Sequence, residues 1–409
     1  MAATAAKSAP LAPRPPLNRT VRMLAMVSLL TDVSSDMIYP LLPAFLTATL
    51  GVSTAFVGAI EGMAESTAAL LKLASGWWSD RMARRKPLVV AGYTLAALTR
   101  PLMALAGSGA QVLAIRLMDR VGKGIRTAPR DALLTDATPP EERGRAFGFY
   151  RAADNFGAVL GPLIAFALMR GAGVPLRSVF WLAAIPGALA VVLLVVAVPD
   201  SARVRTRVPA AVPGEAIGAT TPLGGRFWGV LAAVLLFSLG NSTDAFLLLR
   251  ATELGVPLAV VPLLWAAHNL VKSLSGTPSG SWSDRIGRRP VLLVGWGIFA
   301  VVYAGFAMAT ATWHAWALFV VYGAVFGLAE GTERALIADL APSGRRGAAF
   351  GWFNAAVGLG ALPASLLFGF LWSRYGSATA FLTGAALATA AAVVLSVVPL
   401  RARGMPSTT

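Results

Sequence analysis

Apolar stretches of about 20 residues follow one another along the whole chain, with short polar segments between them. A stretch of that length crosses a hydrocarbon core about 30 Å thick as a single helix. Lipid admits only backbone whose polar groups are paired internally, so we expect these stretches to be helical. The pattern predicts an all-α membrane protein with twelve spanning helices, at residues 24–47, 54–78, 88–106, 110–132, 146–169, 179–198, 226–249, 258–281, 290–309, 315–338, 347–371 and 379–398.

A charged segment interrupts the apolar pattern at two places. It reads SGWWSDRMARRKP at Ser75–Pro87 and SGSWSDRIGRRP at Ser279–Pro290. A later segment, Arg130–Ala153, aligns with Glu333–Ala356 in the same order. The chain therefore contains two six-helix repeats, and because six is an even number both have the same orientation. We expect a pseudo-two-fold axis along the membrane normal to relate them.

The sequence after the sixth apolar stretch is polar, rich in Pro and Gly, and typical of a linker between the two repeats. The first 20 residues are rich in Ala and Pro and lack the apolar core of a cleaved signal peptide. We therefore expect a disordered cytoplasmic tail at 1–20, a six-helix bundle at 21–199, a cytoplasmic linker at 200–225, a second six-helix bundle at 226–400 and a cytoplasmic tail at 401–409.

The net charge is +16, although only 13% of the residues are charged. Most Lys and Arg residues lie in the connections on one side of the predicted membrane, which places both termini in the cytoplasm. These positions favour an anionic lipid leaflet over nucleic acid as the reason for the charge. We expect a monomeric, multi-pass protein of the inner or plasma membrane, with the lipid bilayer as its surroundings and no nucleic-acid partner.

The chain contains no cysteine and only two histidines, His268 and His314. This composition excludes disulfides, thiolate metal sites and cysteine nucleophiles, and it disfavours a histidine-rich metal centre. The sequence also lacks a GxxxxGK[ST] loop, a GxSxG turn and an HExxH helix. We therefore expect no cofactor, no metal and no enzymatic activity.

Ionisable side chains inside membrane spans are energetically costly, so they indicate function by default. The third, sixth, ninth and twelfth predicted spans are almost free of them, with only Arg100 near an extracellular end. We expect these four helices to face lipid and the other eight to surround a central polar cavity. Those eight carry the candidate residues for substrate binding and proton coupling: Asp32, Asp36, Glu61, Glu65, Arg116, Asp119, Arg120, Lys123, Asp154, His268 and Lys272. They also carry Lys72, Arg126, Arg151, Asp244, Glu330, Glu333 and Arg334.

The two charged segments resemble a motif of the major facilitator superfamily of transporters, Gly-x-x-x-Asp-Arg-x-Gly-Arg-Arg/Lys, which follows the second helix of a six-helix half. The first copy, in which Ala83 replaces the second Gly, matches at Gly76, Asp80, Arg81, Arg84 and Arg85. The second copy matches throughout, at Gly280, Asp284, Arg285, Gly287, Arg288 and Arg289. The resemblance covers nearly the whole chain and implies the fold of that family, with twelve helices in two halves.

The residues of this motif have two interpretations. Asp80 and Asp284 can pair with Arg side chains or with a helix N-terminus, and so latch the two halves together on the cytoplasmic side. The basic residues Arg84, Arg85 and Lys86 are better explained as anchors that fix the orientation in the membrane. We favour the latch for the two acids because acidic residues contribute little to orientation.

A second resemblance lies on the fourth span. Its sequence Leu117-x-x-Arg120-x-x-Lys123-Gly124 is similar to the family pattern Leu-x-x-Arg-x-x-Gln-Gly, with Lys123 in place of Gln. The resemblance implies that Arg120 lies near mid-membrane and takes part in proton coupling. The charged residues of this span share one helical face and serve either transport or an ion-pair network that holds the helices together. They are Arg116, Asp119, Lys123, Arg126 and Arg130.

A third resemblance lies on the fifth span. Gly157, Gly161 and Pro162 match the exporter signature Gly-x-x-x-Gly-Pro of the same family, and Ala165 lies near the place of the missing trailing Gly. Small residues let a membrane helix pack closely, and a proline permits a bend. A GxxxG pair alone is common in membrane helices, but the added proline on this helix favours an exporter.

Two pairs of acids are candidates for carrying protons. Asp32 and Asp36 are four residues apart, as are Glu61 and Glu65, so each pair shares one helix face. Acids this close do not all ionise, so we expect at least one of them to hold a proton. We favour Asp36 and Glu65, which the resemblance places beside Arg120, whereas Asp32 lies nearer the cytoplasm. Alternatively, the acids are fully paired with basic residues of the fourth span and never titrate.

On the eighth span, His268 and Lys272 share a face, with Asn269 beside them. One interpretation is that they contact the substrate from the second half. The alternative is that His268 is a buried side chain whose polar atoms are satisfied by its neighbours.

Together these features predict a secondary transporter that moves a small molecule across the membrane by alternating access. Proton-coupled efflux is favoured, with protonation of Asp36 or Glu65 weakening the pairing with Arg120 and so changing substrate affinity. Proton-coupled uptake or exchange of a small organic or inorganic anion is the alternative, because the fourth span has an excess of Arg and Lys. A non-transporting membrane sensor or scaffold is a further alternative, and it would have no central cavity.

Overall fold

The computed structural model describes residues 16–79, 82, 84–139, 142–199, 222–342 and 345–400. These residues form helices and connecting turns, with no β-strand among them. The first half contains α1 (Arg19–Asp36), η1 (Tyr39–Leu41), α2 (Leu42–Ala44), η2 (Phe45–Thr49), α3 (Thr54–Ser79), α4 (Lys86–Leu105), α5 (Gly109–Asp136), α6 (Arg143–Phe166), η4 (Ala167–Gly171) and α7 (Leu176–Ala197). The second half contains α8 (Gly225–Gly240), α9 (Asp244–Glu253), α10 (Val261–Ile286), α11 (Arg288–Met308), α12 (Thr312–Leu340), α13 (Arg346–Tyr375) and α14 (Ser377–Val397).

Within the described residues these elements make twelve spans, at the positions that the apolar pattern predicts. Three spans are composite: α1 continues through η1, α2 and η2, α6 continues into η4, and α8 is followed by α9. Eight spans are long and apolar enough to cross a membrane on composition alone. The other four, α1, α3, α5 and α10, carry most of the candidate charged residues. The prediction of an all-α fold with two six-helix halves is confirmed.

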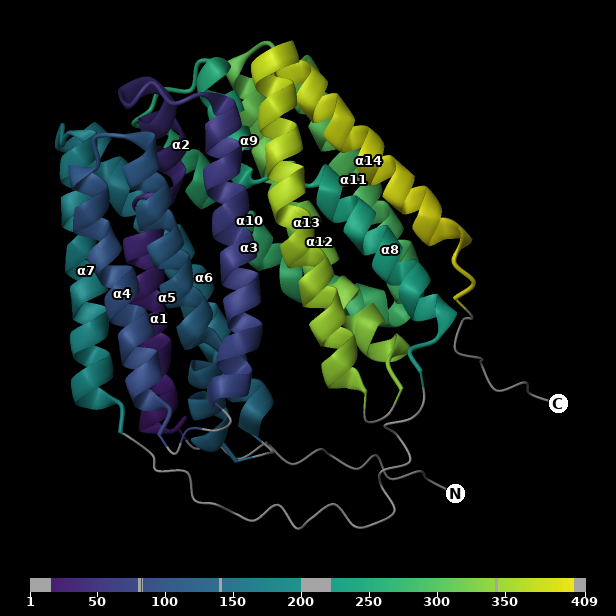
Figure 1. The fold of residues 1–409 in the computed structure, drawn as a ribbon, viewed down its shortest axis with the longest axis horizontal. Helices are drawn as coiled ribbons and strands as arrows, with labels where there is room; N and C mark the ends of the chain where they lie inside the picture. Colours follow the sequence, from purple (N-terminus) through teal and green to yellow (C-terminus); the bar gives the residue numbers. More distant parts are fainter. Residues whose placement is uncertain are drawn as a thin grey trace, which may run out of the picture.

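The two halves lie side by side (Figure 1). Helix α3 packs along α13, and α6 packs along α10, so these four helices form the interface between the halves. Glycine makes the approach possible, because a Cβ on Gly58 would clash with the carbonyl oxygen of Ser365. In contrast, α4, α7, α11 and α14 make their main contacts within their own half, as expected for the four nearly uncharged spans.

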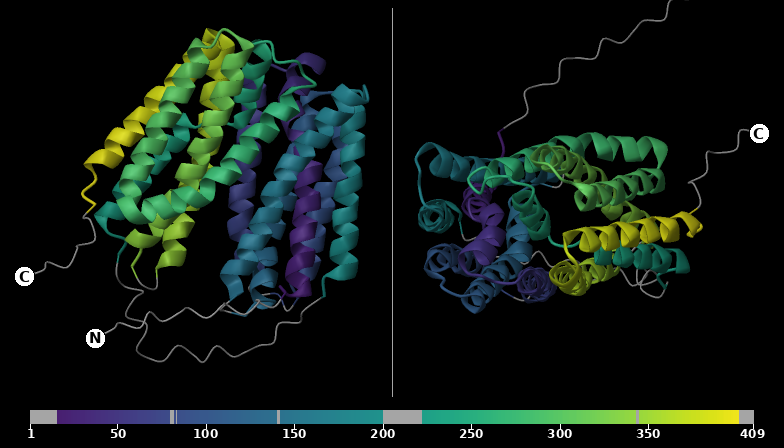
Figure 2. Two further views of the ribbon diagram at one scale, coloured as in Figure 1. Left: turned by 180° about the vertical axis from the view of Figure 1, so that it is seen from behind. Right: turned by 90° about the horizontal axis from the view of Figure 1, so that it is seen from above.

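We call the end of the molecule where α1 begins and α14 ends the terminal end, and the opposite end the distal end. At the distal end α2 packs against α9, and η1 packs against α10. The bundles converge at this end and diverge toward the terminal end, as the front view in Figure 1 and the rear view in Figure 2 both show. The structure is therefore closed between the halves at the distal end.

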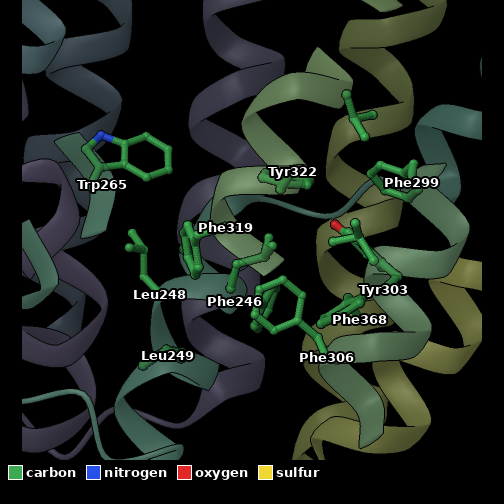
Figure 3. Close-up of a cluster of buried hydrophobic side chains, with 14 of the residues drawn as sticks. Phe246, Leu248, Leu249, Trp265, Phe299, Tyr303, Phe306, Phe319, Tyr322 and Phe368 are labelled. Carbon is green, nitrogen blue, oxygen red and sulfur yellow. The ribbon is translucent and has the colours of Figure 1, made fainter. Parts of the chain in front are cut away.

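An aromatic core fills the second half (Figure 3). Tyr303 stacks on Phe299 with ring centroids 4.1 Å apart, and Phe306 stacks on Phe381 at 5.4 Å. Trp265 lies at one edge of this cluster and contacts the first half, with its ring centroid 5.3 Å from that of Tyr39. The packed core thus fixes the position of a tryptophan that reaches across the interface.

Pro162 leaves one backbone carbonyl of α6 without its usual helical partner. A proline has no N–H, so the carbonyl four residues earlier, that of Ala158, loses its hydrogen bond within the helix. Asn269 of α10 donates its Nδ2 to this oxygen at 3.3 Å. The interface between the halves supplies the missing bond, and α6 continues past Pro162 to Phe166.

The bond between Asn269 and Ala158 leads to a testable prediction. Asn269→Ala should lower stability by about 1 kcal/mol, because it strands a carbonyl in the interior. In a Pro162→Ala background the restored backbone N–H takes over that carbonyl, so the same Asn269→Ala change should cost much less. A double-mutant cycle on the thermal unfolding of detergent-solubilised protein measures the difference. Equal costs in the two backgrounds would contradict this assignment.

Candidate functional site

A cavity of about 250 Å³ lies between the two halves near the middle of the spans, and we call it the central cavity. Its cationic lining residues are Arg100, Arg116, Arg120, Lys123 and Arg126. Its acidic lining residues are Asp32, Asp36, Glu65, Asp119 and Asp244. A second cavity of about 680 Å³, the terminal cavity, lies between α3, α5, α8 and α13 toward the terminal end, and both cavities are lined by Glu65 and Lys123.

One wall of the central cavity is an ion-pair cluster. Glu61 accepts hydrogen bonds from Arg116 Nε at 2.9 Å and Nη2 at 2.5 Å. Asp119 accepts from Arg100 Nη1 at 3.1 Å and lies 3.7 Å from Arg116 Nη1. No side chain of the four is more than 11% exposed. Because removing one partner of such a pair would leave a buried charge, the cluster holds α3, α4 and α5 together.

Arg100 contributes more to this cluster than the sequence predicts. From the sequence we expected Arg100 to be an isolated charge on a lipid-facing span, near its extracellular end. The residue is 6% exposed, and besides Asp119 it donates to Ser35 Oγ at 2.7 Å and to Thr99 Oγ1 at 3.0 Å. Helix α4 lies at the periphery of the half, but this side chain reaches inward to the central cavity.

Glu65 and Arg120 lie together, as the sequence resemblance implies. Arg120 Nη2 is 3.0 Å from Glu65 Oε1. The side chain of Arg120 is 9% exposed, whereas that of Glu65 is 46% exposed. The pair therefore differs from the Glu61–Arg116 pair in one respect, since its acid is accessible from the cavities.

Asp32 and Asp154 form a pair of carboxyl groups between α1 and α6. Their carboxyl groups lie against each other, and Asp154 also accepts a hydrogen bond from Ser28 Oγ at 2.6 Å. Ser28 in turn is hydrogen-bonded to Tyr150. Two carboxyl groups can share a hydrogen bond only when one of them carries a proton. The pair is thus a place for one exchangeable proton, and Asp32 lines the central cavity.

The position of Asp36 differs from our expectation. The sequence interpretation made it an ion-pair partner of Arg120, but in the described contacts Asp36 instead accepts a hydrogen bond from Trp265 Nε1 at 3.0 Å. The reason lies in the backbone, because Asp36 is the last residue of α1, where the helix breaks before η1. The side chain reaches the second half, so Asp36 and Trp265 join the halves beside the central cavity.

Two cations of the central cavity, Lys123 and Arg126, form no ion pair with any described residue. Lys123 is exposed and lines both cavities. Arg126 is 7% exposed, and its guanidinium lies over the ring of Tyr93 at 4.4 Å from the centroid. Its Nε and Nη1 are buried without a hydrogen-bond partner.

The two candidate residues of α10, His268 and Lys272, lie in different surroundings, one buried and one beside a cavity. His268 is 3% exposed, stacks on Trp265 and lies 3.4 Å through Nδ1 from the carbonyl oxygen of Phe319. Lys272, one turn further along α10, is 3.4 Å from Glu330 and lines a separate cavity between α6, α10 and α12. Only the lysine is therefore placed to meet a solute.

Two further acids of the second half accept hydrogen bonds from neutral donors. Asp244, the first residue of α9, accepts from the hydroxyl of Tyr322 at 2.7 Å and lines the central cavity. Glu333 accepts from Trp296 Nε1 at 3.0 Å, and neither Asp244 nor Glu333 forms an ion pair with a described residue. Arg334 pairs with Glu330 at 3.3 Å.

Only part of the first copy of the charged motif lies within the residues that the structure describes. Asp80 and Arg81 lie outside the described residues, and the surroundings of Gly76 and Gly280 are likewise outside them. Arg85 pairs with Asp136 at the end of α5, and Arg84 lies exposed beside it. These contacts fall within the first half.

The second copy of the motif also forms its described contacts within one half. Asp284 is 2.5 Å from Arg288, and Arg288 Nε lies 3.5 Å from Asp339. Gly287 ends α10 with φ of 95°, a conformation that favours glycine. Arg285 is exposed and Arg289 is half-buried. A latch between the halves through Asp284 stays a prediction.

The glycines of the fifth-span signature pack α6 against α1. A Cβ on Gly157 would lie 2.6 Å from the carbonyl oxygen of Leu29, and one on Gly161 would lie 2.5 Å from that of Val33. This close packing of α6 against α1 brings Asp154 close to Asp32. The two glycines of the signature thus set the distance between the helices that carry Asp32 and Asp154.

Sequence reasoning missed Tyr39, Trp265 and the pairing of Asp32 with Asp154. One available signal was not used. Pro40 and Pro43 interrupt the first span, and the polar run Asn241–Thr243 interrupts the seventh, at corresponding places in the two halves. Matched interruptions of this kind point to a binding site in transporters built from repeats. They flank Asp36 and Asp244, which both line the central cavity.

Comparison with known proteins identifies related chains. Residues 24–267 and 230–408 match a family model described as Major Facilitator Superfamily. The chain is 31% identical over 386 residues to the MFS-type transporter MJ1317 of Methanocaldococcus jannaschii, covering 90% of this chain and 94% of that protein. It is 27% identical to the inner membrane transport protein YajR of Escherichia coli over 364 residues, 86% of this chain and 77% of that one. Among solved structures, a bacterial homologue of the human lysosomal transporter Spinster superposes with a TM-score of 0.76 at 16% identity, covering 92% of this chain and 96% of that one.

The difference in exposure between the two Glu–Arg pairs leads to a prediction. Glu61→Gln should lower stability by about 3 kcal/mol, because it leaves the buried charge of Arg116 without its main partner. Glu65→Gln should cost less, about 1 kcal/mol, because its carboxylate is half-exposed and water can take its place beside Arg120. The free energies of unfolding of the two purified variants in detergent, compared with that of the wild type, measure the two losses of stability. Equal losses would show that the two pairs do not differ in this way.

Proposed function

The chain belongs to the major facilitator superfamily of secondary transporters, and we propose that it moves a small molecule by alternating access with protons as the coupling ion. In this proposal substrate and proton bind in the same central cavity, which opens in turn to either end as the halves rock. Both termini lie in the cytoplasm, so the terminal end faces the cytoplasm. The protein acts as a monomer in the inner membrane, the location named for its relative YajR.

The observation that carries the proposal is the carboxyl pair of Asp32 and Asp154. It can hold one proton, it is joined to the cavity through Asp32, and close packing between α1 and α6 fixes its geometry. Lys123 lines the same cavity as Asp32, so a cation shares the cavity with the carboxyl pair. A substrate that changes the electrostatics of this wall therefore changes how tightly the proton is held, which is the differential affinity that coupling requires.

Export is the first candidate for the direction of transport. It rests on the resemblance of Gly157, Gly161 and Pro162 to an exporter signature. In an exporter, proton binding and substrate binding exclude each other, so protons entering from the distal end release the substrate there.

Uptake of an anion together with protons is the second candidate. It is favoured by Lys123 and Arg126, two cations of the central cavity without an ion-pair partner among the described residues. An anion bound beside them would offset their charge and favour the protonated form of the nearby carboxyl pair. Proton and anion would then cross together.

Transport in proteoliposomes tests both the coupling and the direction. With vesicles of one orientation and the distal side made acidic, an exporter should move substrate from the terminal to the distal side, and a symporter should move it the opposite way. Asp32→Asn and Asp154→Asn should abolish this proton-driven accumulation. Exchange of labelled for unlabelled substrate without a pH gradient should persist, because it needs no net change of protonation.

The matched control is Glu253→Gln, which removes an acid paired with Arg250 near the end of α9, outside the central cavity. It should transport like the wild type. Proton-driven accumulation that survives both Asp32→Asn and Asp154→Asn would contradict the assignment of the carboxyl pair. Absence of both accumulation and exchange across a broad compound panel, in the wild type, would contradict transport itself.

A further inference from the structure

Lys123 and Arg126 stand apart from the other charges of the central cavity. They are three residues apart on α5 and therefore lie on one face of the helix. On the same face, Arg116 and Arg120 each have a carboxylate partner, Glu61 and Glu65. Lys123 and Arg126 have none among the described residues.

The surroundings of Arg126 make this lack of a partner costly. The residue is 7% exposed, its guanidinium makes no hydrogen bond to a described residue, and Nε and Nη1 are fully enclosed. Among the described residues, Arg126 makes one cation–π contact, with its guanidinium carbon 4.4 Å from the centroid of the Tyr93 ring. A buried cation without an opposite charge is strongly unfavourable. A cation–π contact offsets only part of that cost.

The neighbouring acids are paired with other groups, and none of them forms an ion pair with Lys123 or Arg126 among the described residues. Glu65 pairs with Arg120, and the carboxyl group of Asp32 lies against that of Asp154. Asp119 is committed to Arg100 and Arg116.

The two remaining acids of the cavity are held elsewhere. Asp36 ends α1 and is bonded to Trp265, and Asp244 begins α9 in the second half and is bonded to Tyr322. Asp244 lies on α9, and Asp36 lies where α1 ends before η1, so both are next to the distal contacts between the halves. Arg126 lies in the part of α5 that runs toward the terminal end. The α5 wall is therefore the cationic side of the cavity.

We infer that Lys123 and Arg126 form a subsite for an oxyanion group of the transported substrate, such as a carboxylate or a phosphate. The inference rests on the proposed transport function and adds the chemical class of the substrate. Lys123 lines both cavities, so an anion entering through the terminal cavity meets Lys123 first and then the guanidinium of Arg126. Guanidinium and ammonium groups bind oxyanions through charge-assisted hydrogen bonds.

Lys123 is also where the fourth span departs from the pattern that it resembles, which has Gln at this place. A glutamine offers a neutral amide, whereas a lysine offers a full positive charge and three donors. The departure adds charge to the wall that already carries Arg126. It is consistent with a negatively charged substrate group at this point of the cavity.

Binding of a matched series of small probes to the full-length protein in detergent tests the subsite. Benzoate, benzamide and benzylamine share one ring and carry a negative, a neutral and a positive group, and inorganic phosphate supplies a second anion. Ligand-induced thermal stabilisation of the wild type should be largest for benzoate or phosphate. Arg126→Gln should weaken that binding at least about ten-fold, as expected for loss of a charge-assisted hydrogen bond.

The matched control is Arg130→Gln on the same helix. Arg130 is hydrogen-bonded to Asp131 at 3.0 and 2.7 Å and does not line the central cavity, so its loss should leave anion binding unchanged. A second readout needs no ligand. Because Arg126 is buried without an ion-pair partner among the described residues, Arg126→Gln should raise the melting temperature of the unliganded protein, whereas a purely structural arginine would lower it.

The inference is overturned if benzylamine stabilises the wild type more than either anion does. It is also overturned if neither anion stabilises the wild type at the highest concentration that the protein tolerates, or if Arg126→Gln binds the anions as the wild type does. Anion binding that depends on Arg126, in a protein that shows no flux in liposomes, would uphold the subsite and refute transport. Flux restricted to cationic compounds would uphold transport and refute the subsite.

Discussion

The structure depends on one constraint, the cost of placing charge inside a bundle of membrane-spanning helices. A charge in a span needs an opposite charge, several donors or water, because lipid provides none of these. The fold meets this constraint by placing four nearly uncharged spans, α4, α7, α11 and α14, at the periphery of the halves. The charged spans α1, α3 and α5 line the space between the halves. Arg116, Glu61 and Asp119 form a paired cluster there, and the accessible charges lie around a cavity.

Much of this arrangement could be predicted from the sequence. The recurring apolar stretches predict the twelve spans, although the four most charged ones, α1, α3, α5 and α10, fall short on composition alone. The resemblance around Arg120 predicts that Glu65 lies beside it, as the structure shows. The partner of Asp36 could not be predicted, because it depends on where α1 breaks and on a tryptophan 229 positions away. The pairing of Asp32 with Asp154 depends on how closely α6 approaches α1, which the glycines permit but do not specify. Contacts between distant segments follow from packing, and hydrophobic periodicity does not encode them.

The contacts between the halves are unevenly distributed along the spans. At the distal end, η1 and α2 meet α10 and α9, and the Asp36–Trp265 hydrogen bond joins the halves beside the central cavity. Toward the terminal end the space between the halves becomes a cavity of about 680 Å³. The interruptions of the first and seventh spans bring Asp36 and Asp244 to the point where closed and open regions meet. A movement that breaks the distal contacts and closes the terminal cavity would present the same charged residues to the other side, which is the geometry that alternating access requires.

The central claim is that the charged residues surround an aqueous space that opens at the terminal end, and the cysteine-free chain allows a direct test. Val357 on α13 lines the terminal cavity, whereas Leu359, two positions along the same helix, is 57% exposed and lines neither the central nor the terminal cavity. The measurement is the rate at which a charged, membrane-impermeant maleimide labels Val357→Cys and Leu359→Cys in membrane vesicles. We expect Val357→Cys to react from the side of the termini and Leu359→Cys to remain unlabelled in lipid. Equal labelling of the two positions, or no labelling of Val357→Cys from either side, would contradict the account.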